Sequence, residues 1–194
     1  MQPLSGVRVV EFCQVAAGPF CAMLLADMGA DVVKVEAPGG DGLRQWPPIS
    51  NGDSENFASI NRNKRSVVLD LKDPAQLEAA RRLALSADVV VENFRPGVMA
   101  KLGLGYDALA KEKPSLVYCS ISAFGQGGPR AEEGGFDLTV QDAADLLDRA
   151  PSTVRGWCTS GVLPGAYRLR GREWRIPRGA LESLRPDRLE VAEQ

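Results

Sequence analysis

The stretch that decides the fold runs from residue 8 to residue 36 and reads RVVEFCQVAAGPFCAMLLADMGADVVKVE. Two Val-rich segments, Arg8–Phe12 and Asp31–Glu36, enclose a helical segment, Phe20–Met28. The proline before the helical segment suits a first helical turn, and the glycine after it suits a C-terminal cap. Short segments that are apolar along their length are typical of parallel strands buried on both faces. The stretch therefore predicts a β-α-β unit with a right-handed crossover.

The same alternation continues toward residue 125. Further apolar segments predict strands at Ser66–Leu71, Asp88–Asn93 and Leu116–Ala123, and two segments between them predict helices at Pro74–Ser86 and Tyr106–Lys111. Two long stretches, Ala37–Asn61 and Gly125–Gly135, are rich in Gly, Pro or Ser and are expected to be irregular. We predict an α/β fold with a partial doubly wound, Rossmann-like parallel sheet.

After Gly135 the pattern changes, and the segments that follow predict a second, smaller domain of short helices and a hairpin. An amphipathic helix is predicted at Leu138–Leu147, and a second helix is capped by Ser152 and runs to about Thr159. A β-hairpin and a third helix follow, at Tyr167–Leu169, Glu173–Ile176 and Pro177–Leu184. We expect a first domain over residues 1–137, a second over 138–184 and a flexible tail over 185–194.

Charge is unevenly distributed between these parts. Residues 1–139 carry 14 Lys and Arg against 17 Asp and Glu, whereas residues 149–178 carry seven Arg and one acidic residue, Glu173. Different partners are expected for the two parts. The chain has no His and no Cys-x-x-Cys pair, which excludes a zinc site and His-based catalysis. With no membrane-length apolar run and no signal peptide in view, we expect a cytoplasmic protein with reduced thiols.

The predicted strand ends lack the Gly-x-Gly-x-x-Gly fingerprint of dinucleotide sites. Other sequence motifs of the first part do point to a family. Five motifs occur in order, namely PLSGVRVVEF with AGP (3–12 and 17–19), GADVVKVE (29–36), NRNKRS with LDLK (61–66 and 69–72), VENFRPG (91–97) and GGFD (134–137). In these motifs the first part resembles CoA-transferase family III, which also includes racemases. The resemblance implies that the first part binds coenzyme A or acyl-CoA. No metal is expected, since the usual ligands are lacking.

The resemblance also implies which residues form the coenzyme A site. Gln14, Ala16 and Ala17 would line the entry near the thioester. The adenine and the phosphates would be bordered by Leu69, Leu71, Lys72, Asn93, Phe94, Arg95 and Lys101. Basic side chains suit the 3′-phosphate and the diphosphate, because charge-assisted hydrogen bonds to phosphate are strong.

One departure from the family concerns catalysis. In the family, an Asp carboxylate beyond the Gly-Gly-Phe-Asp motif attacks the thioester. The corresponding offset falls near Tyr167–Arg170, and no Asp occurs between Asp148 and Asp187. We therefore assign no catalytic residue. The resemblance further implies that the interlocked two-domain architecture of the family is incomplete, so we expect this chain to be inactive as a transferase by itself.

The second part resembles excisionase and MerR-like helix-turn-helix domains from residue 138 to about 184. That resemblance implies that it binds duplex DNA. The second helix would place Ser152, Thr153 and Arg155 at base edges, because the N-terminal end of a recognition helix enters the major groove. Three arginines of the wing would contact phosphates or a minor groove, namely Arg168, Arg170 and Arg172. Trp157 and Trp174 are expected in the core.

Three hypotheses stay open from the sequence. The chain is a DNA-binding protein that carries a coenzyme A site, a transferase subunit that acts only with a complementing subunit, or a non-functional gene fusion. Its expected partners are duplex DNA, coenzyme A, and a second copy or a complementing subunit, and no membrane. DNA binding is favoured as the working activity, because only the helix-turn-helix resemblance covers nearly a whole module.

Overall fold

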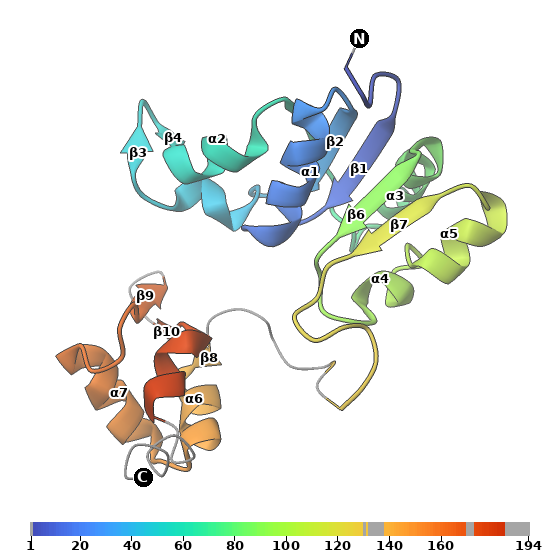
Figure 1. Cartoon of the computed structure of the whole chain (residues 1–194). Coiled ribbons are helices and arrows are strands. Elements are labelled where there is room, and N and C mark those ends of the chain that lie inside the picture. The colour runs from blue at the N-terminus through green and yellow to red at the C-terminus, as the bar shows by residue number, and fades with distance from the viewer. Residues whose placement is uncertain (1, 130, 132–137, 170–172, 185–194) are drawn as a thin grey trace. The chain divides into compact units, whose positions relative to one another are not determined.

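A computed structural model describes residues 2–129, 131, 138–169 and 173–184 of the 194-residue chain. The chain divides into two compact units, Met1–Glu132 and Glu133–Gln194. Figure 1 shows a sheet with helices in the first unit and a smaller, mainly helical second unit.

The first unit is built on a five-stranded sheet in which all neighbouring strands are parallel. The strand order is β5-β2-β1-β6-β7, which reverses direction beside β1 and so defines a doubly wound sheet. This confirms the predicted fold class. The strands are β1 (Arg8–Phe12), β2 (Asp31–Glu36), β5 (Lys64–Val68), β6 (Val89–Glu92) and β7 (Val117–Ser120).

Apolar side chains alternate between the two faces of the sheet, and helices cover both faces (Figure 1). Val9, Val32 and Val91 pack with α1 (Ala17–Asp27) on one face. On the other face, Val10 and its neighbours pack with α3 (Pro74–Ser86), α4 (Val98–Lys101) and α5 (Tyr106–Glu112). Burial on both faces explains why β1, β2 and β6 are rich in valine.

Three predictions about the first unit need correction. The stretch Ala37–Asn61 is not irregular throughout, because it contains η1 (Gly42–Gln45), β3 (Ile49–Ser50), β4 (Asp53–Ser54) and α2 (Glu55–Asn61). Local side-chain caps produce this order, since Asp41 accepts from the Leu43 amide and Ser54 accepts from the Phe57 amide. In addition, β5 begins and ends earlier than Ser66–Leu71, and α1 begins at Ala17 rather than Phe20.

The second unit has the helix-turn-helix and wing that the sequence predicts, with one additional strand. Its elements are β8 (Leu138–Thr139), α6 (Val140–Leu147), α7 (Pro151–Ser160), β9 (Tyr167–Leu169), β10 (Glu173–Ile176) and η2 (Arg178–Leu184). β8 pairs with β10, so the hairpin belongs to a three-stranded antiparallel sheet. Val154, Cys158, Leu163 and Ile176 lie at the centre of a separate core.

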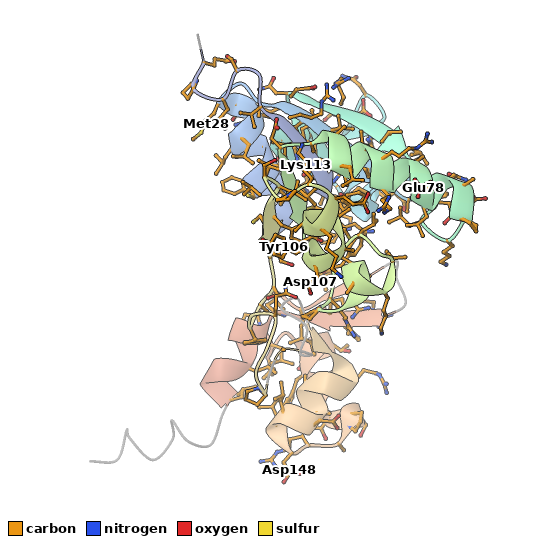
Figure 2. The ribbon with its side chains drawn as sticks, turned by 90° about the vertical axis from the view of Figure 1, so that its right-hand side faces the viewer. Met28, Glu78, Tyr106, Asp107, Lys113 and Asp148 are labelled. Carbon is orange, nitrogen blue, oxygen red and sulfur yellow. The ribbon has the colours of Figure 1, made fainter. Side chains whose placement is uncertain are left out.

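One detail of the second unit differs from prediction. Ser152 does not cap α7, because the helix begins at Pro151, with Ala150 as its N-cap. The third helix is present as a 3₁₀ helix, η2. The turn between α6 and α7 contains Asp148, labelled in Figure 2, in the left-handed region with φ of 51°. The Gly-Gly-Phe-Asp motif and the predicted tail lie outside the described residues.

Candidate functional site

The carboxyl ends of β1 and β6 form the switch point of the sheet, where the chain turns to opposite faces. Gln14 and Asn93 follow these two strands and are joined by two hydrogen bonds. The Gln14 amide donates to Asn93 Oδ1 and Asn93 Nδ2 donates to the Gln14 carbonyl, both at 2.9 Å. The backbone of Gln14 is thereby fixed beside the end of β6.

The N-terminus of α1 lies close against this junction because residue 18 is glycine. A Cβ atom at Gly18 would collide with the side chain of Cys13 and would lie 3.1 Å from Asn93 Cγ. Cys13 is buried and its thiol donates to the Val91 carbonyl, and burial raises the thiol pKa. A buried protonated thiol is a poor nucleophile, so Cys13 is a packing residue.

A cavity of about 310 Å³ lies at the carboxyl ends of the strands of the first unit. It is lined by Phe12, Gln14, Val35, Glu36, Ala37, Leu69, Asp70, Leu71, Lys72, Phe94, Val98 and Leu102. Five of the ten residues that the resemblance implies for coenzyme A are therefore brought together here, namely Gln14, Leu69, Leu71, Lys72 and Phe94. Its lining combines apolar and aromatic side chains with a few polar groups, as is usual for small-molecule sites.

The other five residues are not part of the cavity lining. Ala16 and Ala17 are exposed at the start of α1, and Asn93 bonds with Gln14 as described. Arg95 and Lys101 are also exposed, and Lys101 is the last residue of α4, whose first residue, Val98, lines the cavity.

One of the two acidic residues in the cavity wall, Glu36, has all of its acceptor positions bonded to protein groups. Its Oε2 accepts from the Asp41 amide at 2.8 Å and from Arg44 Nε at 2.7 Å. Its Oε1 accepts from Arg44 Nη2 at 2.6 Å and from Ser66 Oγ at 2.5 Å. A carboxylate has about four acceptor positions. Glu36 therefore has none left for a ribose hydroxyl, which is what an acidic residue after the second strand binds in dinucleotide folds.

The same contacts make the stability of the first unit depend on pH. Burial raises the pKa of Glu36, but the hydrogen bonds from Arg44, Ser66 and the Asp41 amide outweigh burial and lower the pKa from 4.5 to about 2. The Glu36 carboxylate therefore stabilises the folded state above pH 4.5, and this contribution is lost as the pH falls toward 2.

We expect the stability difference between the wild type and Glu36→Gln to fall by about half between pH 5 and pH 3. Urea unfolding of both proteins at the two pH values measures it. Glu78→Gln, on the exposed surface of α3 (Figure 2), is the control and should differ little from the wild type. A Glu36→Gln difference that stays constant with pH would contradict the assignment.

A network of buried charges lies beneath the end of β1, and sequence reasoning missed it. Lys34 Nζ lies 2.9 Å from Asp41 Oδ2 and 3.4 Å from Glu11 Oε1, and Lys64 Nζ lies 3.1 Å from Glu11 Oε1. At most 2% of each of these side chains is exposed. Burial raises the pKa of Glu11 and lowers the pKa of Lys64. A lysine inside an otherwise apolar strand was the signal, because lysine is rarely buried without a partner.

In the second unit, the predicted recognition residues share one exposed side of α7. Ser152, Thr153 and Arg155 are exposed, whereas Val154 and Cys158 face the core. On the wing, Arg168 is exposed and its guanidinium carbon lies 5.0 Å from the centre of the Trp174 ring. Trp157 and Trp174 are partly buried against the core, as expected. Arg170 and Arg172 lie outside the described residues.

Two family models match the chain. The model of CoA-transferase family III matches residues 4–156. The chain belongs to this family. The model of a helix-turn-helix domain matches residues 138–185, so the second unit of this family III chain also carries a helix-turn-helix domain. Both resemblances seen in the sequence are confirmed.

Relatives of this CoA-transferase family III chain are longer than the chain itself. It is 50% identical over 153 residues to the succinate–glutarate CoA-transferase of Agrobacterium fabrum, covering 75% of this chain and 38% of the relative. It is 46% identical over 136 residues to the beta subunit of succinyl-CoA–L-malate CoA-transferase of Chloroflexus aurantiacus, covering 69% and 34%. The family III chain thus spans well under half of the length of these relatives.

A solved structure gives the same family. A CaiB/BaiF family protein from Brucella suis superposes with a TM-score of 0.67 at 30% identity, covering 98% of this family III chain and 57% of the solved chain.

In the described ranges, no helix has the length and apolar character to cross a bilayer. The same ranges contain no group of three or more His, Cys, Asp or Glu side chains placed to hold a metal ion.

Proposed function

We propose that the chain binds coenzyme A or acyl-CoA through residues 1–137 and duplex DNA through residues 138–184, without supplying the carboxylate nucleophile of a transferase. Two complementary features support this division. The cavity of the first unit lies at the strand ends where such folds bind ligands, and α7 of the second unit exposes polar residues over an intact core.

The cavity suits the nucleotide part of coenzyme A. Leu69, Leu71 and Phe94 offer an apolar slot for an adenine ring. Lys72 lies on the cavity wall and is exposed, so its ammonium group can reach a phosphate while it remains partly hydrated. Since Glu36 is occupied by Arg44 and Ser66, it stabilises the cavity wall and leaves phosphate recognition to the basic residues.

Lys72→Ala should weaken coenzyme A binding about tenfold, because a hydrogen bond to a charged group contributes about 1.5–3 kcal/mol and about 1.4 kcal/mol corresponds to a factor of ten. Titration calorimetry with free coenzyme A measures the dissociation constant. Lys111→Ala removes the same charge from the exposed surface of α5 and should bind like the wild type. Equal weakening in both variants would contradict a role for Lys72, and a folded wild type that releases no heat would contradict the coenzyme A site.

The recognition surface of α7 suits the major groove. Arg155 lies one turn into the helix, beside Ser152 and Thr153 at its exposed start. A guanidinium group can pair bidentately with a guanine edge, and the hydroxyls can contact base edges or phosphates. The excess of arginine over acidic residues in this part of the chain supports electrostatic attraction to DNA.

Arg155→Ala should weaken binding to the preferred duplex by about 1–3 kcal/mol, or roughly 5- to 150-fold. Fluorescence anisotropy with a labelled duplex library, at several salt concentrations, measures both affinity and salt dependence. The wild type should lose affinity steeply as salt rises. Lys111→Ala is again the charge-matched control. Absent or salt-independent binding by the wild type would refute the DNA-binding proposal.

A second candidate function is that of a transferase subunit. The Chloroflexus relative is named as a beta subunit, which supports a partner that brings the catalytic Asp. This candidate function is tested by measuring CoA transfer between succinyl-CoA and glutarate, the pair that the names of other relatives suggest, with and without added cell extract. Turnover by the purified chain alone would refute the proposed lack of a nucleophile. A folded protein that binds neither coenzyme A nor DNA would favour a non-functional fusion.

A further inference from the structure

The loop between β1 and α1 contains a residue in an unfavourable backbone conformation. Val15 has φ of 64°, in the left-handed region that β-branched residues rarely adopt. Val15 directly follows Gln14, which lines the cavity. Such a conformation persists only where surrounding contacts hold it, and it is found most often at functional sites.

The contacts that hold Val15 come from Asp41. Its two carboxylate oxygens accept from the Val15 amide at 3.2 and 3.3 Å, and Oδ1 also accepts from the Leu43 amide at 3.0 Å. The Asp41 side chain is fully buried and forms an ion pair with Lys34 at 2.9 Å. Lys34 Nζ also donates to the Cys13 carbonyl at 2.9 Å.

These bonds fix the backbone on both sides of Gln14. Lys34 holds the preceding carbonyl, Asp41 holds the following amide, and Asn93 bonds to the amide and the carbonyl of Gln14 itself. The position of the Gln14 side chain at the cavity is therefore set by side chains from three other segments. The backbone amide of Gln14 is thereby already bonded, whereas its exposed side chain lines the cavity.

We infer that Asp41 is a positioning residue for the thioester end of acyl-CoA, acting through the loop at Gln14 and Val15. The inference rests on the proposed coenzyme A function and on the resemblance that assigns Gln14 to the thioester end. Asp41 itself is buried and does not line the cavity. The adenosine end of the cavity, at Leu71 and Lys72, lies on a different segment of the chain.

The Asp41→Asn substitution distinguishes a role of Asp41 in positioning the loop from a role in folding. An amide offers one acceptor oxygen where the carboxylate offers two, and its NH₂ group cannot accept from Val15 or pair with Lys34. Lys34 keeps Glu11 as an ion-pair partner, which limits the damage to the buried network. Lys113→Met is the control, because Lys113 bonds to the Ala87 carbonyl at the opposite end of the sheet and does not line the cavity.

The test is titration calorimetry on the full chain with two probes, coenzyme A and adenosine 3′,5′-bisphosphate, which has the nucleotide part but no pantetheine arm. Asp41→Asn should weaken coenzyme A about tenfold and the bisphosphate less than about twofold, because only the arm passes the loop. Lys113→Met should change neither. Hydrogen exchange should be faster in Asp41→Asn for the peptide that contains residues 13–17.

Other results would overturn the inference. Equal weakening of both probes would mean that Asp41 supports the whole cavity, and unchanged coenzyme A binding would mean that the loop needs no such support. Both results leave the proposed coenzyme A function standing. If the wild type binds neither probe, the proposed function fails and the positioning role fails with it.

Discussion

Lys34→Met should lower the free energy of unfolding of the first unit by about 3–5 kcal/mol, the largest single effect that we expect in this unit. Lys34 is 1% exposed and its ammonium group serves Asp41, Glu11 and the Cys13 carbonyl. Methionine fills a similar volume but leaves the buried Asp41 carboxylate without its ion-pair partner. An uncompensated buried charge is far more costly than the loss of an exposed one.

Urea unfolding measures this loss, and hydrogen exchange of β1 and β2 amides assigns the transition to the first unit. Arg65→Met is the matched control, since it removes one of the two basic partners of Asp31, at an exposed ion pair in which the Arg65 side chain is 67% exposed. That change should cost no more than about 1 kcal/mol. If Lys34→Met were no more destabilising than Arg65→Met, the buried network would not stabilise the fold.

Ile176→Ala should unfold the second unit and abolish its DNA binding, while the first unit stays folded. Ile176 is fully buried in β10 and packs in the core of this unit. Truncating a buried isoleucine to alanine costs about 2–5 kcal/mol. A module this small buries little surface and has a correspondingly small stability, so a loss of this size is decisive.

Tryptophan fluorescence reports on this loss, because Trp157 and Trp174 pack against the same core. Val162→Ala is the control, since this side chain is 49% exposed and its truncation should change stability by no more than about 0.5 kcal/mol. An Ile176→Ala protein with wild-type fluorescence and wild-type DNA affinity would show that the core of the second unit tolerates the cavity.

The buried strands could be predicted from sequence more reliably than the edge strand or the loops. The observed bounds of β1 and β2 equal the predicted ones, because both strands are rich in valine and lie inside the sheet. The bounds of β5 were wrong because it lies at an edge, where Ser66 and Val68 are exposed and Lys64 carries a charge into the interior. At an edge, hydrophobicity does not mark where a strand begins.

The candidate site was predictable only where it resembles a family. Leu71 and Lys72 were assigned to the ligand from a motif, and the structure places both at the cavity. Asp41 and Lys34 were missed because their roles depend on contacts between segments that are distant in sequence. Sequence periodicity indicates which side of a helix or strand is buried. It does not indicate which buried acidic and basic side chains form ion pairs with one another.

The outer strand β7 has a practical consequence for handling this protein. It lies at the end of the sheet, Val117 is 60% exposed, and residues 116–121 read LVYCSI, without any charge. A short, uncharged segment with high β-propensity at the edge of a sheet can pair with the same segment of other molecules once unfolding exposes it. Such pairing leads to aggregation. We therefore expect heating to cause irreversible precipitation, and we expect unfolding in urea, which keeps this segment solvated, to give the equilibrium stabilities.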